Sequence, residues 1–205
     1  MPLLSLHDLE LDPAPDRLLS VTLPWVVDAG NPFFDWYFGP DEVRPAVERR
    51  MRRHSSELAI RRTVALGAQG EVVGGYIGMG GDVLRSCRLA DALGSLAGEL
   101  RTSQGAPIRD KIVASSRLFP PVSKEAFYLS KIGILRSHRG KGFGRSLLQS
   151  FLDRGRSAGF GRFRLEVAHT NETALGLYRS VGFEVVGDAS LPGTDIRYLW
   201  MELRS

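Results

Sequence analysis

Cysteine is scarce in this chain, since Cys87 is the only one among 205 residues. One thiol cannot form an internal disulfide, so the small secreted folds that depend on a disulfide framework are excluded. The sequence also has no apolar run that approaches the roughly twenty residues of a membrane-spanning helix. Its first residues, Met1 to Asp8, lack a basic stretch followed by an apolar one. We therefore expect no secretory signal peptide and a cytoplasmic location.

Extremes of composition and charge are absent as well. Hydrophobic residues make up 43% of the sequence and charged residues 24%, as in ordinary globular proteins, and the formal net charge is +4. We find no internal repeat and no low-complexity linker. A chain of 205 residues is long enough to bury one substantial core, and it fits one large domain better than two.

Basic charge is concentrated at one place on a predicted helix from Val43 to Arg53. The basic residues there are Arg49, Arg50, Arg52, Arg53 and His54. Val43, Val47 and Met51 mark the opposite, apolar face. A solvated outer face is therefore the favoured interpretation, and a site for an acidic partner such as nucleic acid is the alternative.

The order of predicted elements mixes strands and helices. Apolar alternation predicts strands near residues 18–23, 63–66, 72–79, 126–134, 163–168 and 195–203, the second and third forming a hairpin. Helical spacing predicts helices at 43–53, from Asp82 as a possible N-cap towards Leu100, and from Phe143 to about Gly159. Residues 102–107 are expected as a loop, and the stretch to Leu118 is ambiguous. This order indicates an α/β sheet with helices on both faces.

A basic, glycine-rich turn stands between a predicted strand and a predicted helix. It follows an apolar run that ends at Ile134 and reads Arg139-Gly140-Lys141-Gly142-Phe143-Gly144. The first N–H groups of a helix have no intrahelical partner and the helix dipole is positive there, so such a turn can hold a pyrophosphate. Glycines allow the backbone to approach the anion, and Arg139 and Lys141 add charge. By itself, this composition also fits a plain connection.

A second pattern lies further along the chain. After the predicted strand that ends at Ala168, Asn171 is placed as a helix N-cap and Gly182 as a left-handed stop. The residues between them form a short apolar helical face, and they are Ala174, Leu175, Leu177 and Tyr178. An apolar run, Phe183 to Val186, follows.

With both patterns in this order, the chain resembles the GNAT superfamily of acyl-CoA-dependent N-acetyltransferases. The glycine turn fits its pyrophosphate signature R/Q-x-x-G-x-G/A. The stretch from Asn171 to Phe183 resembles its second signature, an Asn, an Ala three residues on, a Tyr seven residues on, and then Gly-Phe. The resemblance covers Phe127 to Val186 well. It implies a mixed, mostly antiparallel central sheet flanked by helices, one acetyltransferase domain over residues 1–205, and acetyl-CoA as acyl donor with no metal.

The segment 81–125 is longer than a minimal core of this kind needs. We expect a helical insertion before the cofactor-binding strand. It could cover the acceptor cleft, or enlarge the core or a subunit interface such as that of a homodimer. The structural role is favoured, because the apolar periodicity of the insertion needs a burial partner first.

The resemblance also implies which residues hold the cofactor. The strand that ends at Ile134 would pair its backbone with the pantetheine arm near Ile132 and Ile134, beside a bulge that splays it from its neighbour. Gly133 is the expected position of that bulge. The pyrophosphate would lie on the turn from Arg139 to Gly144. Asn171 would cap its helix and could also contact the pantetheine arm.

Attack of an amine on a thioester requires a neutral amine, a stabilised oxyanion and a proton for the departing thiolate. Tyr178 is the candidate acid, because a phenol of pKa near 10 stays protonated at neutral pH and can donate to a thiolate of pKa on the order of 8.5. A covalent route through Cys87 is disfavoured, because a small buried thiol is the ordinary outcome at such a position. Direct transfer in a ternary complex is preferred.

The general base is less well indicated. Several relatives carry a glutamate six residues upstream of the position that Ile134 holds, where this sequence has Tyr128. Our hypothesis for the base is Glu166 or ordered water. Because Arg164 lies on the same strand face, a structural ion pair between Arg164 and Glu166 fits the sequence at least as well. Glu125 and Asp82 stay open as further candidates.

The amine acceptor is indicated only in outline. Between the first strand and the basic helix, aromatic and acidic residues are mixed in a segment that lines the acceptor side of the cleft in relatives. These residues are Trp25, Asp28, Asn31, Phe33, Phe34, Asp35, Trp36, Tyr37, Phe38, Asp41 and Glu42. Such a mixture suits a cationic amine, but a loop packed on the core is equally consistent. Small molecules and proteins are both possible acceptors.

Two functions without turnover are the alternatives. One is an acyl-CoA sensor, which the uncertain base favours and Tyr178 disfavours. The other is a nucleic-acid module built on the basic helix and the glycine turn, although the chain lacks base-stacking aromatic spacing and a zinc-ligand set. No membrane partner is expected.

Overall fold

The computed structural model describes residues 15–68, 71–99 and 107–204. Its helices are α1 (Pro15–Gly30), α2 (Phe33–Phe38), α3 (Val43–Arg52), α4 (Gly81–Gly94), α5 (Ile108–Leu118), α6 (Phe143–Ser157) and α7 (Glu172–Arg179). Its strands are β1 (Thr63–Ala68), β2 (Glu71–Gly80), β3 (Ala126–Ile134), β4 (Arg162–Ala168), β5 (Glu184–Ser190) and β6 (Arg197–Arg204). Short helical turns are η2 (Pro40–Glu42), η3 (Ile60–Arg62), η4 (Ser95–Glu99) and η5 (Arg136–His138). None of the helices in these ranges has the length and apolarity to cross a bilayer.

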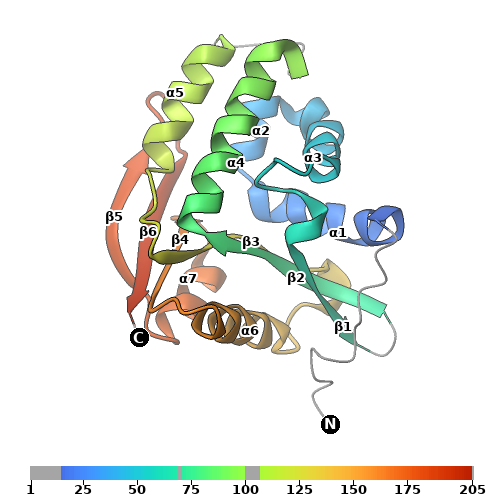
Figure 1. Ribbon diagram of the computed structural model, residues 1–205, viewed down its shortest axis with the longest axis vertical. Coiled ribbons are helices and arrows are strands. Elements are labelled where there is room, and N and C mark those ends of the chain that lie inside the picture. The colour runs from blue at the N-terminus through green and yellow to red at the C-terminus, as the bar shows by residue number, and fades with distance from the viewer. Residues whose placement is uncertain (1–14, 69–70, 100–106, 205) are drawn as a thin grey trace.

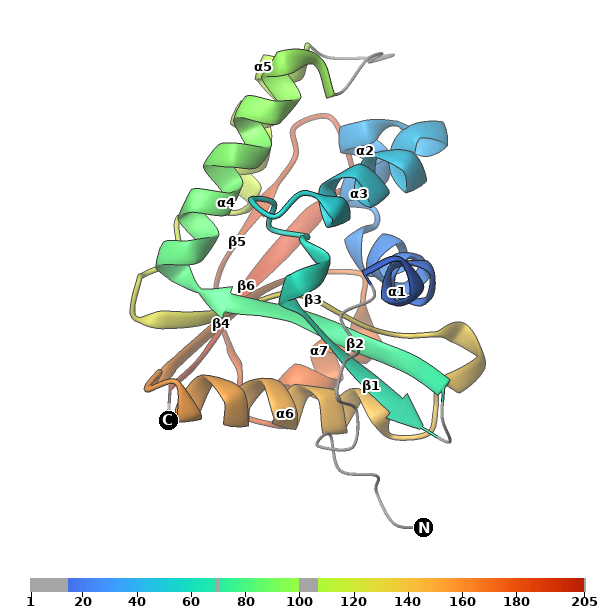
Figure 2. The same ribbon diagram turned by 45° about the vertical axis from the view of Figure 1, so that its right-hand side comes forward.

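The six strands form one sheet in the order β1-β2-β3-β4-β6-β5. All neighbours are antiparallel except β3 and β4, which are parallel. Helices α6 and α7 cover one face, and α1, α2 and α3 cover the other (Figure 1 and Figure 2). The prediction of a mixed, mostly antiparallel sheet flanked by helices is therefore confirmed.

Buried apolar clusters hold the helices on both faces of the sheet. On the face of α6 and α7, side chains of α6 such as Leu147 and Phe151 pack against Phe127 and Phe163 of the sheet. The close fit has a cause in Gly155, because a Cβ there would lie 2.4 Å from the ring of Phe163. The amphipathic pattern that predicted this helix from Phe143 is thus the pattern of its buried face.

The first predicted strand is wrong, because residues 18–23 lie inside helix α1. Six residues of mixed polarity do not distinguish period two from period 3.6. The buried residues Leu19, Leu23 and Val26 recur at helical spacing and continue past Pro24, which the helix includes. The aromatic segment after it is also mostly helical rather than a loop, since Phe34, Tyr37 and Phe38 are buried from α2.

The hairpin of β1 and β2 is confirmed, with Thr63 opposite Ile77, although residues 69–70 of its turn lie outside the described residues. The strands predicted at 126–134, 163–168 and 195–203, and the helix at 43–53, are confirmed to within two residues. Asp82 is wrong as a cap, because α4 begins at Gly81 with Gly80 as its N-cap. A Cβ at Gly81 would lie 2.1 Å from the Ser123 carbonyl oxygen, which explains the glycine at this crossing.

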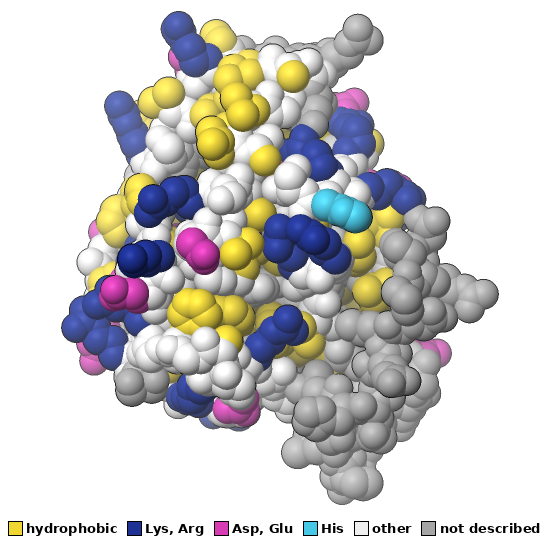
Figure 3. All heavy atoms as spheres, viewed as in Figure 1, with side chains coloured by type: hydrophobic (Ala, Val, Ile, Leu, Met, Phe, Trp, Pro, Cys, Tyr) yellow, Lys and Arg dark blue, Asp and Glu magenta, His cyan; other side chains and the backbone are white. Residues whose placement is uncertain are grey.

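The insertion before β3, predicted over residues 81–125, is helical, as expected. Helix α4 ends at Gly94 and continues as the π-helical turn η4, and the ambiguous stretch before Leu118 forms α5. The expected loop at 102–107 lies outside the described residues except for Pro107. Figure 3 shows apolar side chains gathered over α4 and α5. Leu89 and Leu93 of α4 are 62% and 57% exposed, so only part of the apolar periodicity is used in burial.

The basic face of α3 is only partly a solvated one. Arg49 and Arg52 are exposed, and Arg52 pairs with Glu48 at 3.0 Å. Arg50 donates to Ser95 Oγ at 2.9 Å and lies over the ring of Phe38, and Arg53 pairs with Asp91 of α4. Two of the five residues of the predicted outer face, Arg50 and Arg53, therefore fasten α3 to the insertion.

Candidate functional site

Strands β3 and β4 pair only at one end. Their parallel register joins Ala126–Leu129 to Arg162–Leu165 and then stops. Beyond that point the strands diverge around a cleft of about 590 Å³, which reaches from the start of α6 to α7. It is lined by all of the predicted cofactor and catalytic residues except Lys141, namely Ile132, Gly133, Ile134, Arg139, Gly140, Gly142, Phe143, Gly144, Glu166, Asn171 and Tyr178. Lys141 is exposed and outside this lining.

The bulge that accompanies this divergence is at Ser130, and the prediction of Gly133 is wrong. On β2, Ile77 pairs with Lys131 and the next residue, Gly78, pairs with Leu129, so Ser130 is the extra residue. Gly133 pairs regularly with Gly75. Its lack of a side chain has another reason, because a Cβ there would lie 3.0 Å from the ring of Trp25 on α1.

The bulge turns two successive polar side chains to the same face of the sheet. Ser130 Oγ donates to Glu57, and Lys131 Nζ lies 5.4 Å from the ring centroid of Phe34. Without the extra residue, Lys131 would point into the apolar cluster below α6. A pair of polar residues inside an otherwise apolar strand was the sequence signal for this position.

Backbone groups of β3 face the open side of the cleft. The amide of Leu135 donates to Val73 of β2 at 2.8 Å. Because amides alternate in direction along a strand, those of Ile132 and Ile134 point to the opposite edge, where β4 has diverged. One wall of the cleft therefore carries strand amides that β4 does not pair with.

The glycine turn closes one end of the cleft. Gly140 and Gly142 have φ of +78° and +83°, in the left-handed region that glycine adopts without strain. Gly142 is the N-cap of α6, and its carbonyl accepts from the Arg145 amide at 3.1 Å. The first turn of α6 thus brings its amides and the positive end of its dipole to the cleft.

Two arginines beside this turn are held by one carboxylate. Asp28 of α1 accepts from Arg136 at 3.0 and 3.1 Å and from Arg139 at 3.0 Å. Arg139 also donates to the carbonyl of Ile134 at 3.1 Å. The hydrogen bond from Arg136 lowers the pKa of Asp28, and the charge of Arg139 adds to this effect against the opposing effect of burial. Arg139 is therefore aligned at the end of β3, beside the turn.

Helix α7 brings Asn171 and Tyr178 to the cleft. Asn171 Oδ1 accepts from the Ala174 amide at 3.2 Å, so the predicted N-cap is confirmed. Gly182 has a φ of +98°, as its predicted left-handed stop requires. Tyr178 is 5% exposed and packs against the ring of Phe183. Burial raises the pKa of its phenol well above the ordinary value of 10, so the hydroxyl keeps its proton at neutral pH.

Glu166 of β4 is buried in a network of donors, with a side chain that is 1% exposed. It accepts from the Tyr128 hydroxyl and from Arg164 at 3.3 Å, and it lies 3.8 Å from Arg88. The ion pair with Arg164 that the sequence indicated is therefore present. Burial raises the pKa of Glu166, although the charge of Arg88 opposes this.

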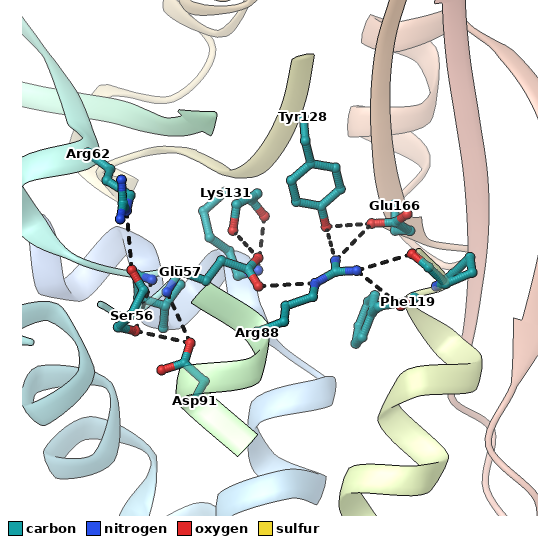
Figure 4. Close-up of polar contacts among 12 residues, drawn as sticks. Ser56, Glu57, Arg62, Arg88, Asp91, Phe119, Tyr128, Lys131 and Glu166 are labelled. Carbon is teal, nitrogen blue, oxygen red and sulfur yellow. Dashed lines mark hydrogen bonds and ion pairs between the residues drawn. The ribbon is translucent and has the colours of Figure 1, made fainter. Parts of the chain in front are cut away.

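A second buried carboxylate, Glu57, belongs to the same network and is not among the residues predicted from the sequence. It follows α3, and it accepts from Ser130 Oγ and from Arg88 Nε, the latter at 3.3 Å (Figure 4). Burial alone would raise the pKa of Glu57, but the charges of Arg88 and Lys131 outweigh it and lower the pKa. No local pattern marks Glu57, because its partners Arg88 and Ser130 are distant in the sequence.

The other candidates lie away from the cleft. Asp82 and Glu125 are exposed, and neither lines it. Cys87 lies on the buried face of α4 and is 2% exposed, and burial raises the pKa of its thiol, which disfavours a nucleophile. Within residues 15–68, 71–99 and 107–204, no three His, Cys, Asp or Glu side chains are grouped so that they could hold a metal ion.

The segment proposed for the acceptor is divided between two cavities. Trp25, Asp28 and Asn31 line the cleft. Phe33 and Tyr37 line a separate cavity of about 520 Å³ beneath the insertion. Phe34 and Phe38 are core residues. The segment is thus neither wholly core nor wholly site.

Comparison with known proteins agrees with this geometry. Residues 85–183 match the family model of the acetyltransferase (GNAT) family. Over 68 residues, or 33% of this chain and 39% of the relative, the sequence is 44% identical to the N-alpha-acetyltransferase RimI of Mycobacterium tuberculosis. Over 59 residues, or 29% of this chain and 31% of the relative, it is 39% identical to a streptothricin acetyltransferase of Streptomyces lavendulae. The match therefore spans well under half the length of either relative.

The fold is shared over nearly the whole chain. An N-acetyltransferase from Staphylococcus aureus Mu50 superposes with a TM-score of 0.67, covering 92% of this chain and 96% of that one at 20% identity. At this identity, the superposition describes the common architecture. The family match, residues 85–183, includes β3, α6, β4 and α7, which line most of the cleft.

Proposed function

Because residues 85–183 belong to the GNAT superfamily of acetyltransferases, we propose that the protein transfers the acetyl group of acetyl-CoA to a primary amine. The amine attacks the thioester carbonyl directly in a ternary complex. A carbon–nitrogen bond forms, the carbon–sulfur bond breaks, the amine loses a proton and the coenzyme A thiolate gains one.

The observation that carries this proposal is the divergence of β3 from β4 beside the glycine turn. The unpaired amides of Ile132 and Ile134 would receive the pantetheine arm as if it were another strand. At the end of that wall, the amides of Gly142 to Gly144 and the guanidinium of Arg139 would hold the pyrophosphate. Exposed Lys141 would add charge near the phosphates, and Asn171 a polar contact to the arm.

Tyr178 is proposed as the group that protonates the thiolate. Its place in the cleft wall and its protonated phenol support this role. Glu166 is proposed to take the proton of the amine, directly or through ordered water. A carboxylate whose pKa is raised by burial is a stronger base than an exposed one, which supports this assignment.

A sensor that binds acetyl-CoA without turnover is the second candidate. The donors that surround Glu166 favour it, because each of them lowers the tendency of the carboxylate to accept a further proton. A nucleic-acid module has less support, because Arg50 and Arg53 are engaged by groups of the protein itself.

A cytoplasmic location and a homodimer stay predictions. Sedimentation equilibrium tests the homodimer, and a monomer at all protein concentrations would contradict it.

Isothermal titration calorimetry with acetyl-CoA tests the proposal first. We expect saturable binding of one acetyl-CoA per chain and release of free thiol when an accepted amine is added. Binding without thiol release for a broad panel of amines would favour the sensor. No binding of acetyl-CoA or coenzyme A by the folded protein would end the acyl-transfer proposal.

A further inference from the structure

A second cavity lies on the face of the sheet that α1, α2 and α3 cover, close to the cleft. It has a volume of about 520 Å³ and is enclosed by α2, α4 and α5, so most of its wall belongs to the insertion. In Figure 1 and Figure 2, α4 and α5 stand beside α2 above the sheet. This size is within the range of small-molecule sites.

The walls of this cavity are mainly aromatic and aliphatic. Phe33 and Tyr37 come from α2, Leu84 from α4, Ile112 from α5 and Phe119 from the segment after α5. Of the charged side chains of the upper wall, Arg50 donates to Ser95 and Asp91 is paired with Arg53, while Arg85 is exposed. The upper cavity therefore suits an apolar group.

The floor of the cavity carries one ionised carboxylate. Glu57 and Arg88 both line it, and their side chains are only 15% and 24% exposed. Arg88 is occupied on all three nitrogens, because it donates to Glu57, to the carbonyls of Phe119 and Pro120, and to the Tyr128 hydroxyl. The arginine is thus committed to the protein. Glu57 is paired with it through Oε2, while its Oε1 accepts from the hydroxyl of Ser130, a neutral donor that an ammonium group can replace.

The same floor separates the cavity from the cleft. Glu57 lines the cavity, and Ser130, whose hydroxyl donates to Glu57, lines the cleft. Arg88 is joined through Tyr128 to Glu166, which also lines the cleft (Figure 4). One layer of hydrogen-bonded side chains at the bulge therefore separates the two spaces.

From this arrangement we propose that the insertion forms the acceptor site, and that the acceptor is a small primary amine on an aromatic or branched aliphatic body. This rests on the proposed acetyl transfer. The apolar body occupies the cavity, and the amine replaces the Ser130 hydroxyl at Glu57, so that it passes the separating layer and stands in the wall of the cleft beside the thioester. A polyamine finds one available carboxylate for several charges, and a peptide N-terminus finds few partners for its backbone amides in an apolar wall.

The test compares amines and two tryptophan variants of α5. Substrates are 2-phenylethylamine, 3-methylbutylamine, spermidine and an alanine-terminated tetrapeptide, with thiol release as the readout. For the wild-type protein we expect kcat/KM for the two apolar amines to exceed that for spermidine and the peptide by about tenfold or more. Ile112→Trp, which fills the cavity, lowers kcat/KM for the apolar amines by about tenfold or more. Val113→Trp is the matched control, because Val113 is the next residue of the same helix and is 48% exposed.

A substitution of the floor gives an independent result. In Glu57→Gln, KM for the apolar amines rises by about tenfold while the Kd of acetyl-CoA stays within twofold, since a charge-assisted hydrogen bond to the ammonium is lost. Thermal unfolding reports whether this variant retains its fold. If it does not, the comparison of Ile112→Trp with Val113→Trp still decides.

The outcomes separate this inference from the proposed function. Loss of acetyl-CoA binding in the wild-type protein ends both. Acetyl-CoA binding with preferred turnover of spermidine or the peptide overturns the inference and leaves the transfer intact. An unchanged kcat/KM in Ile112→Trp, or no turnover of either apolar amine, also overturns the inference.

Discussion

In the proposed reaction, the departing thiolate takes its proton from the hydroxyl of Tyr178. Tyr178→Phe removes the proton donor and leaves the shape of the buried ring. We expect kcat to fall about a hundredfold or more, with the Kd of acetyl-CoA changed less than twofold. Calorimetry and thiol release measure the two quantities.

Tyr76→Phe is the matched control for this change. Tyr76 is a buried tyrosine of β2, hydrogen-bonded to Ser150 and absent from the lining of the cleft. Its substitution should leave kcat within twofold. A Tyr178→Phe variant as active as the wild type, with the same pH dependence, would remove Tyr178 from the mechanism.

Glu166 predicts a particular dependence on pH. Glu166 can accept a proton only when it is ionised, so activity rises as pH rises through its pKa. Burial raises this pKa above the ordinary value of 4.5, and the charge of Glu57 adds to the rise. Arg88, Tyr128 and Arg164 oppose it. In Glu166→Gln the rising limb of kcat/KM moves to more alkaline pH, because the amine must lose its proton to solvent before it attacks. The full pH profile of kcat/KM measures this shift. An identical profile for the variant would leave ordered water as the base.

At the scale of elements, a carboxylate at the end of α1 reduces the positive charge beside the glycine turn. Asp28 neutralises part of Arg136 and Arg139 where the pyrophosphate would bind. Its side chain is 29% exposed, and those of Arg136 and Arg139 are 80% and 53% exposed, so solvent screens both pairs and each is weak. Asp28→Asn should therefore lower the Kd of acetyl-CoA by about two- to fivefold, as calorimetry measures.

Asp28→Asn also removes a small pH-dependent contribution to the free energy of unfolding. Because the pKa of Asp28 is lowered in the folded state, its contribution is present above the unfolded pKa and is lost as pH falls through the folded pKa.

For the effect on acetyl-CoA binding, Asp188→Asn is the control, because Asp188 pairs with Arg197 on an exposed strand pair outside the cleft lining. Weaker acetyl-CoA binding in Asp28→Asn would mean that Asp28 chiefly orients Arg139.

At the scale of the whole molecule, ligand binding should stabilise the folded chain. A ligand at a hundred times its Kd adds about 2.7 kcal/mol to the free energy of unfolding. For a chain of this size, we expect the Tm to rise by roughly 5–10 °C with acetyl-CoA or coenzyme A. Thermal unfolding with and without these compounds measures it, and duplex DNA or RNA serves as the comparison. A rise with nucleic acid that disappears at high salt would instead support binding through the basic helix.

Local chemistry could be predicted from the sequence because it depends on residues close together in the chain. The turn from Arg139 to Gly144 needs its positive φ values at glycine, and α7 needs its cap at Asn171 and its stop at Gly182. Both features follow from backbone sterics and hydrogen bonds within one or two turns. The strand and helix that flank the glycine turn follow equally from short-range apolar periodicity.

Tertiary contacts decided what depends on residues far apart. Residues 18–23 became helix because one face of α1 is buried, and Gly133 is small because Trp25 lies over it. The bulge settled at Ser130, where a hydroxyl meets Glu57 from a distant segment. The amino-acid sequence by itself determined the glycine turn, α7 with its cap and stop, and the signatures that match the GNAT family model. Packing between distant segments decided the bulge, the buried carboxylate pair and the cavity, because burial and charge pairing are summed over the folded chain rather than along it.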